Sequence, residues 1–126
     1  MNYLIVFLGA GVGGALRHGV NMAGVRLGWT TFPAATFAIN VSGSLVMGLA
    51  AGIFAFRAGL PQPVRLFLMT GVLGGYTTFS AFSLDAATLW ERGRPGLAAL
   101  YVAGSVVLSI AALFGGLAVI RTLLRA

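Results

Sequence analysis

The residues best suited to chemistry lie together between residues 70 and 83, Thr-Gly-Val-Leu-Gly-Gly-Tyr-Thr-Thr-Phe-Ser-Ala-Phe-Ser. This stretch combines three glycines, five Ser or Thr hydroxyls and three aromatic rings inside a long apolar segment. Non-helical backbone at membrane depth persists only where it is buried in protein or lines a wet cavity. The composition therefore predicts a break in a membrane-spanning helix, and a break there indicates an ion site or a transport pathway.

Two further sets of polar residues repeat every four positions, so that each set shares one face of a helix. They are Thr36, Asn40 and Ser44 in one segment, and Tyr101, Ser105 and Ser109 in another. In lipid, such side chains face the bundle interior or a cavity. Hydrogen bonds between helices explain a single Ser or Thr. The Asn40 amide has two donor hydrogens and an acceptor, and burying it unsatisfied costs about 2–7 kcal/mol. A pathway role is therefore the favoured interpretation for Asn40, with helix pairing as the alternative.

Phe79 and Phe82 are three residues apart and share a helix face. Packing is the usual role of aromatics at this spacing, but here glycines and hydroxyl residues flank them. The positive edge of an aromatic ring offers a weak favourable contact to an anion. A broken helix also frees amide N–H groups that attract anions and carbonyl groups that coordinate cations.

Several kinds of chemistry are disfavoured by what the sequence lacks. The acidic residues are Asp85, near the end of an apolar segment, and Glu91, in a connector. Neither lies at mid-span, where a proton-coupled antiporter needs a carboxylate. There is no cysteine and one histidine, so neither a disulfide nor a thiolate metal site is expected. We see no nucleophile with a base beside it and expect no enzyme.

The elements that position these residues are predicted to be membrane-spanning helices. Of the 126 residues, 59% are hydrophobic and 8% are charged, whereas a soluble domain has about 25% charged residues. Apolar stretches of this length are typical of spans. Four are predicted, at residues 3–21, 32–56, 64–90 and 97–120. The fold class is therefore all-α, with four transmembrane helices and a broken third helix in one domain, 1–126.

The ends of these spans are less well defined than their existence. The first span either ends at the interface near Arg17 or continues with Arg17 facing water. Short connectors are expected around 24–31, 57–63 and 91–96. No basic stretch precedes the first span, so we expect it to be retained rather than cleaved as a signal peptide. Glycines spaced four apart allow close helix packing, and the two pairs of this kind are Gly9 with Gly13 and Gly48 with Gly52.

The charge distribution bears on orientation. The formal net charge is +6, and all eight basic residues are arginines scattered near the span ends, which is unlike a nucleic-acid-binding surface. One side of the membrane would carry Arg57, Arg65, Arg121 and Arg125, and the other Arg17, Arg26, Arg92 and Arg94. Because each side would carry four arginines, the positive-inside rule favours neither orientation. This balance predicts insertion in both orientations and pairing of opposite copies about an axis in the membrane plane. The alternative is a one-way protein whose balance is a coincidence.

At this point the residues resemble a known family, the Fluc (CrcB-type) fluoride channels, over essentially the whole length. The stretch Gly-Gly-Tyr-Thr-Thr-Phe-Ser-Ala-Phe at 74–82 is similar to the family's Gly-Gly-Phe-Thr-Thr-Phe-Ser-Thr-Phe signature. Residues 36–43 look like its Gly-Thr-x-x-x-Asn-x-x-Gly segment, and residues 13–17 like its Gly-Ala-x-x-Arg. The departures are Ala35 for Gly, Ala81 for Thr, Asp85 for Glu, and His18 where an aromatic is common.

The resemblance implies an antiparallel, dual-topology homodimer with two fluoride pores, each built from both subunits. By motif position, it implies a pathway formed by Asn40, Phe79, Phe82, Tyr101 and Ser105. We expect the hydroxyls of Ser80 and Thr36 to add donors along that pathway. The resemblance implies that Arg17 lies by an aqueous vestibule. It also implies that the backbone carbonyls of Gly74 and Thr77 hold a central structural sodium ion (Na+) at the dimer interface.

The function expected from the resemblance is a passive, fluoride-selective channel in a bacterial-type inner membrane, with multiple spans in the lipid bilayer. It would export cytoplasmic fluoride and so confer fluoride resistance. One alternative is a small multidrug-type proton-coupled antiporter, which would need a membrane-embedded Glu that the first span lacks. Another is a non-transporting membrane subunit of a larger complex, which would carry no flux alone.

Overall fold

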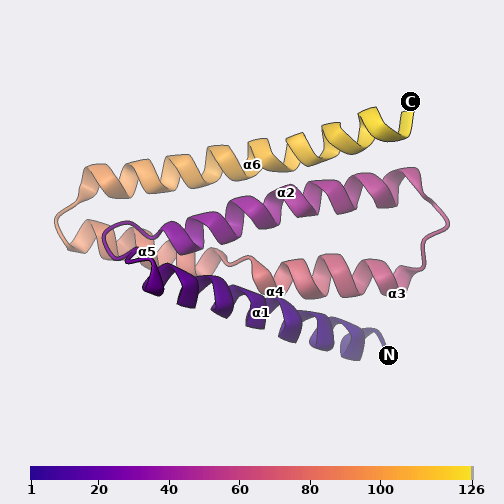
Figure 1. Cartoon of the computed structure of the whole chain (residues 1–126), viewed down its shortest axis with the longest axis horizontal. Coiled ribbons are helices and arrows are strands. Elements are labelled where there is room, and N and C mark those ends of the chain that lie inside the picture. Colours follow the sequence, from indigo (N-terminus) through magenta and orange to yellow (C-terminus); the bar gives the residue numbers. More distant parts are fainter. Residues whose placement is uncertain (126) are drawn as a thin grey trace.

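A computed structural model describes residues 1–125, and all regular elements in that range are helical. In chain order (Figure 1) they are α1 (Asn2–Arg26), α2 (Ala34–Phe56), α3 (Gln62–Arg65), η1 (Leu66–Leu73), α4 (Gly74–Tyr76), α5 (Phe79–Glu91) and α6 (Pro95–Arg125). The predicted all-α class is confirmed.

Three of these helices, α1, α2 and α6, are long and apolar enough to cross a membrane. The predicted third span is instead divided into the run α3–η1–α4 and the separate helix α5. Between them Thr77 and Thr78 have extended backbone, with ψ angles of 155° and 116°. The predicted break is therefore present at the predicted place. The expectation of four spanning helices becomes three continuous helices and one interrupted segment, part of which, η1, is a wide π-helix.

The first helix is longer than residues 3–21, because α1 continues through Arg17 to Arg26. Its connector to α2 therefore lies at residues 27–33 rather than at 24–31. Of the two expectations for Arg17, continuation of the helix is the correct one. Arg17 is half-buried and lies nine residues before the end of α1, so at 1.5 Å per residue it is about 13 Å below that end.

Helix packing depends on glycines at the spacing that the sequence indicated. The closest helix pairs are α2 with α6 and α1 with η1. A Cβ atom added to Gly9 would lie 2.6 Å from the Phe67 carbonyl oxygen, and one added to Gly52 would lie 2.8 Å from Ile120 Cβ. At Gly9 the neighbouring backbone leaves no room for a side chain, and at Gly52 the Ile120 side chain fills the space, as in small-residue packing of membrane helices.

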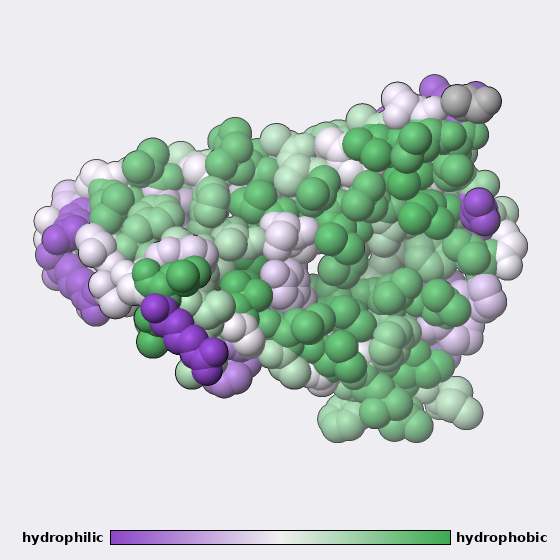
Figure 2. Space-filling model, in the orientation of Figure 1, coloured by the Kyte–Doolittle hydropathy of each residue, from purple (hydrophilic) through white to green (hydrophobic). Residues whose placement is uncertain are grey.

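The surface fits a membrane environment. Figure 2 shows hydrophobic residues over most of the visible face, with hydrophilic residues mainly towards the two ends. Both termini and the α2–α3 connector lie at one end, and the α1–α2 and α5–α6 connectors lie at the other (Figure 1). Seven of the eight arginines follow the two groups expected from the sequence, and Arg17 is the one that lies well inside a helix.

Candidate functional site

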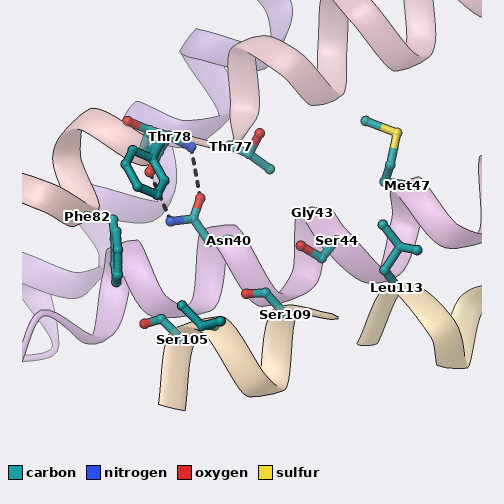
Figure 3. A pocket seen from close by; sticks show the side chains of 12 residues that line it. Asn40, Gly43, Ser44, Met47, Thr77, Thr78, Phe82, Ser105, Ser109 and Leu113 are labelled. Atoms are coloured by element: carbon teal, nitrogen blue, oxygen red, sulfur yellow. Dashed lines mark hydrogen bonds between the residues drawn. The ribbon is translucent and has the colours of Figure 1, made fainter. Parts of the chain in front are cut away.

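The Asn40 side chain joins α2 to the break between α4 and α5. The Thr78 N–H donates to Asn40 Oδ1 at 2.8 Å, and Asn40 Nδ2 donates to the Thr78 carbonyl at 3.0 Å (Figure 3). The Asn40 amide therefore satisfies both the N–H and the carbonyl of Thr78, as a neighbouring β-strand would do for an extended residue. In lipid, unpaired backbone groups are strongly disfavoured, so this pair stabilises the interrupted conformation.

Two adjacent threonines close the helix ends on either side of the break. Thr77 Oγ1 donates to the Leu73 carbonyl at 2.9 Å, which also accepts the Thr77 N–H at 3.0 Å. Thr78 is the N-cap of α5, where its Oγ1 accepts the Ala81 N–H at 3.1 Å. Such a cap satisfies one of the free N–H groups of the first helical turn. The break is thus built from side chains on both of its flanks.

A second contact ties α2 to α4 near the same level. Ser42 Oγ and the Tyr76 hydroxyl lie 3.0 Å apart. The Tyr76 ring also lies over Gly43, where an added Cβ would come within 3.2 Å of it. The backbone on the amino-terminal side of the break is therefore held against α2 by hydrogen bonding and by close packing.

A cavity of about 290 Å³ lies beside the break, between α2, α5 and α6 (Figure 3). It is lined by Asn40, Gly43, Ser44, Met47, Thr77, Thr78, Phe79, Phe82, Ser105, Val106, Ser109 and Leu113. It brings together four of the predicted pathway residues, Asn40, Phe79, Phe82 and Ser105. Ser44 and Ser109, from the two polar helix faces, also line it.

The cavity presents hydrogen-bond donors and ring edges in an otherwise apolar setting. Ser105 is 5% exposed, and its Oγ has no hydrogen-bond partner among the described residues. Asn40 Nδ2 carries two hydrogens, and the bond to Thr78 uses one of them. The Phe79 and Phe82 rings are 5.5 Å apart and tilted by 51°. Since Phe79 is the first residue of α5, the positive end of that helix also adjoins the cavity.

Three predicted pathway residues lie outside this lining. Thr36 and Tyr101 are buried, with 8% and 0% exposure, whereas Ser80 is exposed. The Tyr101 ring packs against Phe82, which lines the cavity, with centroids 5.3 Å apart. Tyr101 therefore lies next to the cavity but is separated from it by the Phe82 ring. Its hydroxyl donates to Asp85 Oδ2 at 3.1 Å. This partnership was missed in the sequence, although a carboxylate near a span indicates that a partner is needed.

The residues predicted for the vestibule and the cation site also lie outside the cavity, except for Thr77. Arg17 is half-buried on α1, and Gly74 is exposed at the start of α4. Within residues 1–125 no group of three or more His, Cys, Asp or Glu side chains could hold a metal ion.

These features define the class of the protein: a helical membrane protein in which an interrupted helix lines a polar cavity, as in channels and transporters. The family model described as "CrcB-like protein, Camphor Resistance (CrcB)" matches residues 4–117. The chain therefore belongs to the CrcB-like family.

Similar proteins match along nearly their whole length. The "Fluoride-specific ion channel FluC" of Rhodopseudomonas palustris (strain BisB5) is 68% identical, covering 98% of this chain and 99% of the relative. "Fluoride-specific ion channel FluC 2" of Nitrobacter hamburgensis is 65% identical with the same coverage. The "Fluoride-specific ion channel FluC" of Paracoccus denitrificans is 52% identical over 96% of this chain and 95% of the relative. The family resemblance seen in the sequence is confirmed.

The Asn40 pairing leads to a direct prediction. Replacing Asn40→Ala leaves the N–H and the carbonyl of Thr78 without their partner, at a cost of about 1–3 kcal/mol for each group. We expect the melting temperature of the purified protein in detergent to fall by several degrees or more. Ser44→Ala, one turn further along α2 and facing the same cavity, is the matched control and should change it little. Equal melting of the two variants would show that the break does not depend on Asn40.

Proposed function

We propose that the protein is a passive, fluoride-selective ion channel that exports cytoplasmic fluoride across a bacterial inner membrane. The similar proteins described above carry the name fluoride-specific ion channel. The observation in this chain that carries the proposal is the buried Ser105 hydroxyl, which lines a cavity beside the helix break and has no hydrogen-bond partner within residues 1–125. A buried donor of this kind is costly unless something accepts its hydrogen bond.

Fluoride is small and strongly hydrated, so a pore must replace its water with several donors. The second Asn40 N–H and the hydroxyls of Ser105 and Ser109 would serve that purpose. The edges of Phe79 and Phe82 would add weak positive contacts. This mixture favours entry without holding the ion too tightly, which conduction requires. Thr36, Tyr101 and Ser80 stay predicted pathway residues, with Tyr101 joining the path beyond Phe82.

We further propose a structural sodium ion on the carbonyls of Gly74 and Thr77. In an unbroken α-helix these carbonyls would accept hydrogen bonds from the N–H groups of Thr78 and Ala81. Here the Thr78 N–H is directed to Asn40 and the Ala81 N–H to Thr78 Oγ1. Both carbonyls therefore lose their helical donors, and free carbonyl oxygens suit a hard cation. Sodium would add fixed positive charge near the anion path.

An antiparallel homodimer with two pores completes this proposal. Phe79 lines the cavity and yet is 78% exposed in the single chain, so a second copy placed over Phe79 would close the cavity on that side. Gly74 is exposed as well, as expected of a site shared between two copies. Arg17 is half-buried and about 13 Å from the end of α1, and an arginine within a span needs water or a partner, which supports its place beside an aqueous vestibule.

Flux from liposomes tests the function. Liposomes that contain the purified protein and K⁺ salts, with valinomycin added so that K⁺ carries the compensating charge, should lose fluoride down its gradient far faster than chloride, because the donors and the narrow path suit the smaller ion. An ion-selective electrode follows each anion. Protein-free liposomes give the background rate. Equal loss of both anions would refute selectivity, and loss no faster than background would refute the channel.

The same liposomes test the sodium site. Replacing Na+ on both sides with N-methyl-D-glucamine, which is too large for a carbonyl site, should greatly reduce fluoride loss. Returning Na+ should restore it. Unchanged flux after thorough removal of Na+ would count against a role of sodium in the conducting form, while leaving the fluoride pathway itself in place.

Dual topology can be measured by thiol labelling, because the natural chain has no cysteine. With Ala58→Cys, in the α2–α3 connector, the arginine balance is unchanged, and a membrane-impermeant maleimide should label about half of the protein in intact cells and the rest after permeabilisation, as expected without a positive-inside preference. Gly96→Cys, at the opposite end, also keeps every arginine and should give the same fraction. Complete labelling of one variant and none of the other would establish a single orientation.

A further inference from the structure

A second cavity, of about 230 Å³, lies where the α1–α2 connector meets the carboxy-terminal half of α5. Its connector side is formed by residues 29–33, including Thr30 and Thr31. Its α5 side includes Asp85, Thr88 and Arg92, which share one face of that helix. The lining is more polar than that of the first cavity, and it contains two charged groups of opposite sign.

One side chain separates the two cavities. The fully buried Tyr101 ring packs against Phe82, which lines the first cavity, at 5.3 Å between centroids. It packs edge-on against Phe32, which lines the second, at 5.5 Å. The Tyr101 hydroxyl donates to Asp85, which also lines the second cavity. The second cavity is therefore separated from the first by the side chain of a single tyrosine.

From this arrangement we propose that the second cavity is the port at this end of the pathway, and that Arg92 sets its electrostatic selectivity for anions. The inference rests on the proposed function. The Asp85 carboxylate lies at the inner end of the port, where it repels an approaching anion. Arg92, the residue that follows the end of α5, lies seven residues beyond Asp85, which is about 10 Å along the helix axis. Its positive charge offsets Asp85 and raises the local concentration of anions, as a charged cleft does.

The chain offers a matched control for Arg92. Arg94 belongs to the same connector and carries the same charge, but it does not line the port. Both arginines are exposed, so they contribute equally to the net charge of this end of the molecule. A difference between them therefore reports position in the port rather than overall surface charge.

The test is fluoride efflux from liposomes with Arg92→Gln, Arg94→Gln and the natural protein, each at two ionic strengths. At about 10 mM salt, exposed charges act over about 30 Å, and at about 1 M over about 3 Å. We expect Arg92→Gln to slow efflux about three- to tenfold at low salt and much less at high salt. Arg94→Gln should stay near the natural rate under both conditions.

Three results would refute the proposal that the second cavity is a port. They are an unchanged rate of fluoride efflux in Arg92→Gln, an equal loss of rate in Arg94→Gln, or a loss of rate in Arg92→Gln that persists at high salt. An absence of fluoride flux from the natural protein would instead refute the proposed function.

A second variant keeps the test valid if Arg92→Gln folds poorly. Arg92→Cys introduces a single thiol into a chain that otherwise has none. Reaction with methanethiosulfonate reagents forms a mixed disulfide and releases methanesulfinate, so it attaches either a positive or a negative group to the same folded protein. Efflux at low salt should be faster with the positive group than with the negative one. Equal rates would show that charge at this position does not act on the ion.

Discussion

The two hydrogen bonds between the Asn40 amide and the Thr78 backbone are the interaction on which the rest of the site depends. A membrane provides no water to satisfy an open helix, so each freed N–H and carbonyl needs a partner within the protein. An amide side chain can satisfy both groups of one residue because it carries a donor and an acceptor. Without this pair, the extended backbone at Thr77 and Thr78 would be unfavourable, and the cavity beside it would lose its wall.

The packing of the long helices makes this arrangement possible. Gly48 and Gly52 allow α2 to lie directly against α6, and this places Asn40 and Ser105 on two walls of one cavity. On the other side, Gly9 and Gly71 bring α1 and η1 into backbone contact. The break is therefore set between two closely packed helix pairs. Small residues give rigid support here, since lipid supplies no hydrophobic force to hold helices together.

Much of this could be predicted from the sequence because it is local. The glycines and hydroxyls at 70–83 predicted the break, and four-residue spacing predicted the polar faces that carry Asn40 and Ser105. The partner of Asn40 lies 38 residues away, and no local pattern indicates which backbone group an amide will meet. The same is true of Tyr101 and Asp85. The length of α1 was underestimated because Arg17 suggests a helix end, whereas a half-buried arginine within the helix depends on the tertiary environment.

The most direct measurement is an experimental density map of the purified protein in lipid, with fluoride and sodium present. We expect extended backbone at Thr77 and Thr78, the Asn40 amide within hydrogen-bonding distance of both Thr78 groups, and ion or water density beside Ser105. A continuous helix through residues 74–82, with Asn40 turned away and lipid filling the cavity, would contradict this expectation.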